Sequence, residues 1–309
     1  MGQGLRADDR ATAVSGGVAA MNCSIDWQDI LDRDDLDTLV ALAREAYMPA
    51  VRLLLTAAVD RDTAGFAAWF KTFSASASGF GLPPVCKLYG REPHFRRNLD
   101  AVWQAGWRAM VFAHEPALMA ELADAGGDLL FRHATSPEDV AMMRRGGSRT
   151  LVATSPHYLV PVGGLQRAFP VRPPLPEDAS RERFVWETFA EIDVIATDHV
   201  AADATTGPGL ASQQHFLPAL VHLAETAGVD FDSVLAKAST APAAVFGGHP
   251  APDSFAILAP RPPGLPVLAG TARDPFADTP FSHVVVAMVS GDTIVRTPAF
   301  HAILQGALS

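Results

Sequence analysis

Short apolar runs alternate along the chain with longer segments in which apolar residues recur every three or four positions. The run "VRLLLTAAV" at 51–59, for example, is followed by "TAGFAAWFKTF" at 63–73. The short runs are typical of buried strands and the periodic segments of amphipathic helices. The predicted strands lie at 16–22, 51–59, 83–90, 109–115, 129–135, 149–159 and 192–199. The predicted helices lie at 35–47, 63–73, 95–103, 117–127, 136–147, 210–228 and 230–247.

This alternation predicts a parallel sheet whose strands are joined by helical crossovers. With a short segment at 1–6, the chain offers about eight strands, which is the number that closes a (β/α) barrel. We therefore predict an α/β fold of the (β/α)8 TIM-barrel type over residues 1–247. Residues 248–309 are rich in proline and glycine, and we expect them to form a short appendage packed on the barrel. An open, doubly wound sheet is the competing architecture.

Composition is typical of a globular enzyme and excludes some functions. Of the 309 residues, 49% are hydrophobic and 19% charged, and the formal net charge is −10. No lysine or arginine cluster stands out, so nucleic acid is not an expected partner. No apolar run approaches the ~20 residues that span a membrane, and the N-terminal segment lacks the apolar region of a secretory signal. Cys23 and Cys86 are too few for a disulfide framework, so we expect a soluble cytoplasmic protein.

Several predicted strands end in side chains that ionise or bind metals. Lys87 lies in the strand at 83–90, and His114 and His133 end two later strands. The last predicted strand of the sheet ends in Asp198, followed by a histidine. Active sites of α/β folds are assembled at the carboxyl ends of parallel strands, so these side chains should lie close together.

Two histidines and an aspartate in one place favour a metal such as zinc. A buried lysine could join them only as a carbamate formed with carbon dioxide. Each residue alone has an ordinary explanation, such as a hydrogen-bonded histidine, a helix cap or a lysine that reaches solvent. It is their joint occurrence on successive strands that favours a metal site. We interpret His157 as a pocket residue, and the following as surface or packing residues: His94, His215, His222, His249, His283 and His301.

The order of these segments resembles the dihydroorotase and cyclic amidohydrolase family, which includes hydantoinases and allantoinases. "CKLYG" at 86–90 resembles the family's carboxylated-lysine strand, and "FAHE" at 112–115 its "VHAE" segment. "FRHATSPEDV" at 131–140 resembles its "HxS" segment, and "TSPHYLV" at 154–160 is similar to "CPHYL". "DVIATDHVAAD" at 193–203 is similar to "DVIATDHAPH". The likeness covers nearly the whole chain in the same order.

The resemblance implies a metal-dependent hydrolase that opens or closes a cyclic amide or ureide. Carboxylated Lys87 would bind a metal together with His114 and His133. Asp198 would be a further metal ligand and the acid/base that activates a metal-bound water and protonates the leaving nitrogen. The chemistry of amide cleavage supports this role, because it needs a proton acceptor and then a donor. Zinc is the expected metal, and one ion is favoured over two.

The chain departs from the family pattern at its first strand. That strand normally ends in His-x-His followed by Leu-Arg, and if residues 5–6 match Leu-Arg, Gly2 and Gly4 stand in place of the histidines. Since glycine has no side chain, one of the two family metal sites would keep at most Lys87 and Asp198.

The expected contacts to substrate are also incomplete. Ala202 replaces the final histidine of "DHAPH", which in dihydroorotases helps to hold the substrate carboxylate. Arg6, and Asn22 in "AMNCS", match the other two carboxylate contacts, and His157 would line the same pocket. A guanidinium can grip a carboxylate through two parallel hydrogen bonds. We therefore expect a small cyclic amide that carries a carboxylate, with poor affinity for dihydroorotate itself.

Two hypotheses of different classes follow. In the first, the chain is a divergent amidohydrolase, which the retention of Lys87, His114, His133 and Asp198 favours. In the second, it is a catalytically inactive dihydroorotase-like protein that serves as a structural or regulatory partner, which the loss of the first-strand histidines favours. The enzyme is the preferred hypothesis, and a homo-oligomer is the expected assembly.

Overall fold

The structure is a computed structural model. It describes residues 7–30, 51–59, 63–76, 83–161, 171–200, 208–246, 254–265, 274–277 and 279–307. The expected strand at 1–6 and the expected helix at 35–47 lie outside these residues, as does Arg6.

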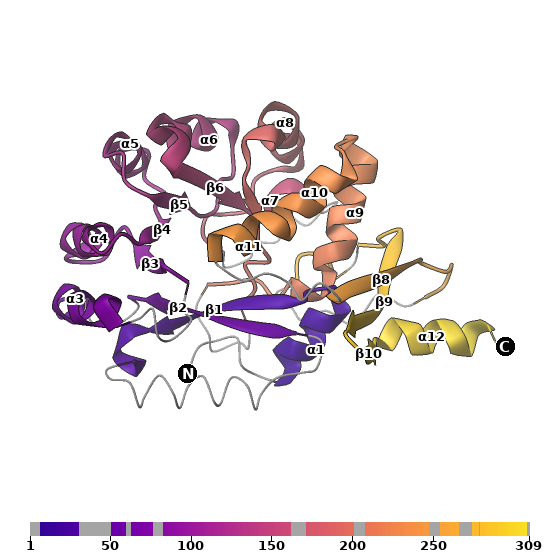
Figure 1. The fold of residues 1–309 in the computed structure, drawn as a ribbon. Helices are drawn as coiled ribbons and strands as arrows, with labels where there is room; N and C mark the ends of the chain where they lie inside the picture. The colour runs from indigo at the N-terminus through magenta and orange to yellow at the C-terminus, as the bar shows by residue number, and fades with distance from the viewer. Residues whose placement is uncertain are drawn as a thin grey trace.

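The centre of the described fold is a curled sheet of seven parallel strands (Figure 1). The strands are β1 (Ala20–Asp26), β2 (Arg52–Ala58), β3 (Val85–Tyr89), β4 (Arg108–Phe112), β5 (Leu129–Phe131), β6 (Thr150–Thr154) and β7 (Val194–Ile195). Their order in space is their order in sequence, and each pairs in parallel with the next. A doubly wound sheet would reverse direction at a switch point. The described order shows no reversal, so the sequential arrangement expected of a barrel is confirmed for these strands, while closure of the barrel stays a prediction.

Helices follow most of these strands (Figure 1). They are α3 (Phe66–Ser76), α4 (Phe95–Gln104), α5 (Pro116–Asp124), α6 (Pro137–Met143), α7 (Pro156–Leu159), α8 (Asp178–Thr188), α9 (Phe216–Ala227), α10 (Phe231–Ala238) and α11 (Thr240–Phe246). Short 3-10 turns lie at Trp27–Asp29, Arg144–Arg149, Phe189–Glu191 and Gln213–His215. Among the described helices, none has both the length and the apolar character needed to cross a membrane.

Two of the expected strands have different bounds in the structure. The strand expected at 16–22 begins at Ala20 and runs on to Asp26, because Gly16 and the left-handed Gly17 end helix α1 (Ala7–Ser15). Glycine is needed at position 16 because a Cβ there would overlap the backbone of Gln213. The strand expected at 149–159 ends at Thr154, so the expectation was wrong for the residues after it. Pro156 begins the short helix α7 instead, and proline is favoured at the first position of a helix.

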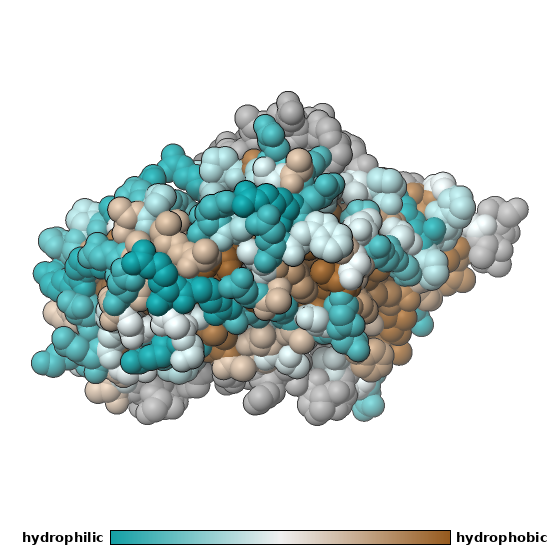
Figure 2. All heavy atoms as spheres, turned by 90° about the horizontal axis from the view of Figure 1, so that it is seen from above, coloured by the Kyte–Doolittle hydropathy of each residue, from teal (hydrophilic) through white to brown (hydrophobic). Residues whose placement is uncertain are grey.

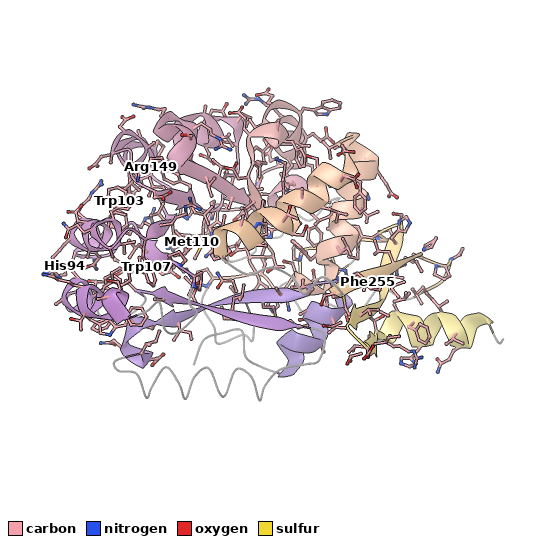
Figure 3. All side chains as sticks on the ribbon, viewed as in Figure 1. His94, Trp103, Trp107, Met110, Arg149 and Phe255 are labelled. Carbon is pink, nitrogen blue, oxygen red and sulfur yellow. The ribbon has the colours of Figure 1, made fainter. Side chains whose placement is uncertain are left out.

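Alternation of side chains along the strands divides the sheet residues between two clusters. One cluster packs on the inner face of the curl against α11, and Figure 3 labels one of its members, Met110. Its buried residues are Val85, Met110, Leu130, Ala153, Val194 and Val245. Their strand neighbours, such as Cys86, Val111 and Phe131, point the other way and join the larger core under the helices.

The large core contains a group of aromatic rings that packs α3 against neighbouring segments. Its members are Trp27, Phe66, Trp69, Phe70, Phe73 and Trp107. Trp69 also donates its indole N–H to the carbonyl oxygen of Ile30 at 3.0 Å. Phe70 is fully buried, and its ring stacks on Phe66 and meets Trp107 edge-on.

A second, antiparallel sheet lies at the end of the molecule where the chain ends (Figure 1). It has the order β10 (Thr293–Arg296), β9 (His283–Ser290) and β8 (Ser254–Pro260), followed by α12 (Pro298–Ala307). Strand β9 packs on both α1 and α9, so this sheet joins the N-terminal helix to the main fold. The domain boundary expected at 247–248 lies at the edge of an undescribed stretch and stays a prediction.

The face seen in Figure 2 is polar over the helices and more apolar toward the second sheet. Large apolar side chains that stay exposed on this sheet and α12 are Phe255, Ile257, Ile294 and Leu304. Trp186, on α8, is the other large apolar residue that is exposed in the described part of the chain.

We expect Phe70→Ala to lower the free energy of unfolding by about 3–5 kcal/mol, because it opens a cavity among packed rings. The matched control is Trp186→Ala, since Trp186 is 77% exposed and its loss should change stability by no more than about 0.5 kcal/mol. Urea unfolding of the two variants would measure the difference. Equal losses would contradict the position of the aromatic group in the core.

Candidate functional site

The candidate site lies at the carboxyl ends of the parallel strands, where the inner face of the sheet continues past the apolar cluster. Lys87 and Arg132 each stand two positions after an inner residue of their strands, and His114 and Asp198 each stand four positions after one. Because strand side chains alternate between faces, Lys87 and Arg132 belong to the inner face, whereas His114 and Asp198 follow two and three residues after the ends of β4 and β7. The apolar floor of the sheet and the polar strand ends are therefore consecutive layers of one surface.

Asp198 is the centre of the described contacts. Its Oδ1 accepts a hydrogen bond from Arg132 Nη2 at 2.6 Å. Its Oδ2 lies 3.3 Å from His133 Nδ1 and 3.8 Å from His157 Nε2. The Asp198 side chain is 15% exposed, and the two histidine side chains are 4% and 0% exposed. Three strand ends thus place a cation and two imidazoles around one nearly buried carboxylate.

Two of these residues have left-handed backbone conformations. His133 has φ 63° and Asp198 has φ 48°, and the other described non-glycine residue with positive φ is His94, before α4. Such conformations are unfavourable for residues with a Cβ and often mark functional sites. Alternation alone would send His133 to the outer face after Phe131. The left-handed turn reverses this and brings its imidazole to Asp198.

Three imidazole nitrogens at the site are buried without a hydrogen-bond partner. They are Nε2 of His114 and both ring nitrogens of His157. The His114 and His133 rings lie 6.4 Å apart between centroids, and Phe112 meets both of them edge-on. Buried polar atoms normally have partners, so open nitrogens suit a site that takes up a ligand.

The protein interior keeps these histidines neutral. Burial lowers the pKa of His157 to about 3, with a smaller contribution from the charge of Arg181. Burial, together with the charge of Arg91, lowers the pKa of His114 to about 4. For His133, burial and then the charge of Arg132 hold the pKa well below its ordinary value. The neutral imidazole is the form that binds metals.

Burial acts on Asp198 in the opposite sense and raises its pKa above the ordinary value. The charges of Arg132 and Lys87 partly offset this effect. Lys87 is half-buried, its Nζ lies 4.9 Å from the centroid of the Tyr89 ring, and its charge also lowers the pKa of His133. Lys87 therefore lies within electrostatic reach of both Asp198 and His133.

The structure does not place all the predicted site residues together. Asn22 lies near the amino end of β1, away from the strand's carboxyl end at Asp26, and its Oδ1 accepts a hydrogen bond from Thr56. His157, predicted as a pocket residue, lies in the first turn of α7 beside Asp198. Within the described residues, no three His, Cys, Asp or Glu side chains form a group arranged to hold a metal. Lys87 is not among those residue types.

Arg132 is the site residue that the sequence interpretation missed. The histidine after it drew attention, while the arginine was treated as part of a strand. Its position two residues after the inner-face Leu130 was the available signal, because alternation assigns it to the same face as Lys87.

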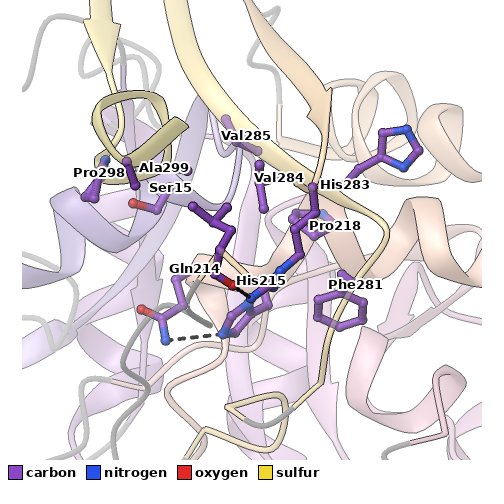
Figure 4. A pocket seen from close by; sticks show the side chains of 13 residues that line it. Ser15, Gln214, His215, Pro218, Phe281, His283, Val284, Val285, Pro298 and Ala299 are labelled. Carbon is purple, nitrogen blue, oxygen red and sulfur yellow. Dashed lines mark hydrogen bonds between the residues drawn. The ribbon is translucent and has the colours of Figure 1, made fainter. Parts of the chain in front are cut away.

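A cavity of about 130 Å³ lies elsewhere, between the second sheet and α9 (Figure 4). His215, which the sequence suggested was a surface or packing residue, lines it and is buried, with Nε2 3.0 Å from Oδ2 of Asp274. Gln214 donates a hydrogen bond to the same carboxylate oxygen. Because these polar groups bond to one another, we interpret them as structural.

No family model and no curated protein matches the chain by sequence. Solved structures do match. A dihydropyrimidinase from Brevibacillus agri NCHU1002 is 14% identical, with a TM-score of 0.71 over 94% of this chain and 79% of that one. The chain has the fold of the cyclic amidohydrolases.

Of two further solved structures with this fold, one is named as an enzyme and the other as an inactive domain. A D-hydantoinase (dihydropyrimidinase) from Thermus sp. is 13% identical, with a TM-score of 0.70 over 94% of this chain and 79% of that one. The inactive dihydroorotase-like domain of a Chaetomium thermophilum CAD-like multifunctional protein is 15% identical, with a TM-score of 0.64 over 97% of this chain and 92% of that one. The predicted resemblance to cyclic amidohydrolases is confirmed at the level of the fold.

The lowered pKa of His157 predicts that stability depends on pH. A histidine whose pKa falls on folding contributes stability that is complete above about pH 6.5 and is lost as the pH falls toward the folded-state value. Between pH 7 and pH 5, His157 alone should account for a loss of about 2 kcal/mol. Urea unfolding at both pH values would measure the total loss of stability, which should be smaller in His157→Leu than in the wild type by about 2 kcal/mol. An identical pH dependence in the variant would contradict the burial of a neutral imidazole.

Proposed function

We propose that the chain is a divergent cyclic amidohydrolase, a closed (β/α)8 barrel that breaks or forms the C–N bond of a small cyclic amide or ureide. The observation that carries this proposal is the nearly buried Asp198 carboxylate, held at a strand end against two neutral imidazoles by left-handed backbone. Sites with shifted pKa values and strained backbone at the carboxyl ends of parallel strands are typical of catalysis.

The donor set fits one divalent ion, for which we propose zinc. Carboxylated Lys87, His114 and His133 would hold it, with Asp198 at its side. The buried Nε2 of His114 without a hydrogen-bond partner supports this assignment, as does the neutral state of both imidazoles. The ion would supply a Lewis acid for the amide carbonyl.

Asp198 would move the proton. Its Oδ1 is fixed by Arg132, whereas Oδ2 faces the two histidines at longer distances. Oδ2 is therefore the atom that can accept a proton from the attacking water and return it to the leaving nitrogen. The effect of burial on the pKa of Asp198 favours this exchange, because a raised pKa makes the carboxylate a stronger base.

The proposed substrate is a small cyclic amide that carries a carboxylate, with Arg6 as its main contact. His157 would line the ring pocket, and its position beside Asp198 supports this role. Equal activity on uncharged hydantoins and on carboxylated rings would contradict this choice of substrate. A cytoplasmic location and a homo-oligomeric assembly belong to the same proposal.

The alternative is an inactive, structural or regulatory protein with the same fold. A specific observation favours it as well, because the hydrogen bond from Arg132 engages the carboxylate that would act as base. The likeness to an inactive dihydroorotase-like domain is consistent with this alternative. Metal binding and turnover separate the two functions.

We expect Asp198→Asn to fold and to lose turnover by about 100- to 10,000-fold, because it removes the proton acceptor but keeps the size of the side chain. The control is Asp193→Asn, which alters a carboxylate just before β7 that bonds to Arg144 and to the backbone of Val152. Turnover of hydantoin and dihydroorotate analogues would be measured for both variants. Unchanged turnover in Asp198→Asn would remove this residue from the mechanism.

We also expect the purified protein to bind close to one equivalent of zinc, and Lys87→Ala to lose most of it. Elemental analysis after dialysis would measure the content, with Lys71→Ala, an exposed lysine on α3, as the control. A wild-type protein without zinc and without activity on any cyclic amide would favour the inactive alternative.

A further inference from the structure

Arg132 and Asp198 form an ion pair that two strands hold in place. The backbone N–H of Arg132 donates to Val111 on β4 at 3.0 Å, and Ala196, two residues before Asp198, donates to Thr154 on β6 at 2.9 Å. The guanidinium and the carboxylate meet at 2.6 Å with 17% and 15% of their side chains exposed. Both members of the pair are thus anchored to the sheet and partly withdrawn from water.

A carboxylate in such a place needs a positive charge close by. The two imidazoles near Asp198 lie farther from its carboxylate than this guanidinium does, at 3.3 Å for His133 and 3.8 Å for His157. Arg132 makes the direct contact, and Lys87 acts from farther away. If Lys87 is carboxylated, it becomes an anion, and Arg132 is then the cation at hydrogen-bond distance from Asp198.

We propose that Arg132 is a built-in cation, which takes the place of a second metal ion beside Asp198 and limits the site to one divalent ion. The limit to one ion rests on the proposed function, whereas the pairing of Arg132 with Asp198 does not. If residues 5–6 match the family's Leu-Arg, Gly2 and Gly4 stand where the family pattern has two imidazoles, which agrees with a site that does not need a second ion.

A guanidinium differs from a metal ion in what it can do here. It keeps its charge at all relevant pH values and donates hydrogen bonds from a rigid plane. It has no open coordination position, so it cannot bind and activate a water as a metal does. Arg132 is therefore a positioning residue: it fixes Oδ1 of Asp198 and leaves Oδ2 turned toward His133.

The chain offers a second arginine–aspartate pair as a matched control. Arg108 donates two hydrogen bonds to Oδ1 of Asp128, from Nη2 at 2.9 Å and from Nε at 3.2 Å. This pair lies at the amino ends of β4 and β5, opposite the candidate site. Its side chains are 25% and 36% exposed, and it has no contact with the candidate site in the described hydrogen bonds. Because this pair is more exposed than Arg132–Asp198, we expect it to contribute less to stability.

A double-mutant cycle on the metal-free full chain tests the pairing. We expect Arg132→Met to lower the ratio of folded to unfolded protein by about 100-fold or more, because it leaves a buried charge unpaired. Adding Asp198→Asn should raise that ratio again by at least about tenfold, since it removes the stranded charge. The cycle of Arg108→Met and Asp128→Asn should show a coupling of no more than about fivefold. Additive effects at Arg132 and Asp198 would overturn the proposal, and Arg132→Lys, which keeps the charge, should keep most of the stability.

Zinc titration by calorimetry tests the limit to one ion. Wild-type protein should bind at most one equivalent, and Arg132→Met should bind zinc at least about tenfold more tightly, because a fixed positive charge is removed and Asp198 is released. Arg108→Met should leave the affinity unchanged. Two equivalents in the wild type, or an unchanged affinity in Arg132→Met, would overturn the inference. If neither protein binds zinc, the proposed function fails, and the stability cycle alone decides whether Arg132 is the cation for Asp198.

Discussion

The site depends on one constraint, which is that the Asp198 carboxylate is held almost out of water at the end of a strand. The charge of a carboxylate there must be compensated, and the guanidinium of Arg132 does so, while two imidazoles lie on the other side of the carboxylate. The left-handed backbone of His133 and Asp198 allows this meeting. The sheet provides the rigid support, because the backbone N–H groups of Arg132 and Ala196, close to these two residues in sequence, donate to neighbouring strands.

Much of the fold could be predicted because it depends on local patterns. The run at 51–59 became β2 and the periodic segment at 63–73 became α3, since buried strands and amphipathic helices differ in their hydrophobic period. Element ends were less predictable. The strand expected at 149–159 stops at Thr154 because Pro156 favours a helical start, and β1 begins late because Gly16 has to pass close to the backbone of Gln213. Such a contact, about 200 residues apart in sequence, cannot be found from local spacing.

The sequence predicted site residues but not their electrostatics. Lys87, His114 and Asp198 were expected to lie close together because they end successive strands, and Lys87 is within electrostatic reach of Asp198. The contact between Arg132 and Asp198 joins β5 to β7 across β6, and the sequence gives no measure of that distance. Both functions considered for this chain are compatible with this contact. The same guanidinium that orients a catalytic carboxylate can also neutralise one that no longer acts.

We propose that one metal ion and one guanidinium share the anionic groups at these strand ends. Anomalous diffraction at the zinc absorption edge, from crystals grown with zinc, would locate the ion. We expect a single peak bounded by Lys87, His114 and His133, with Arg132 still bonded to Oδ1 of Asp198. Two peaks with Arg132 displaced from Asp198, or density that shows the Arg132 side chain turned away without any ion, would contradict it.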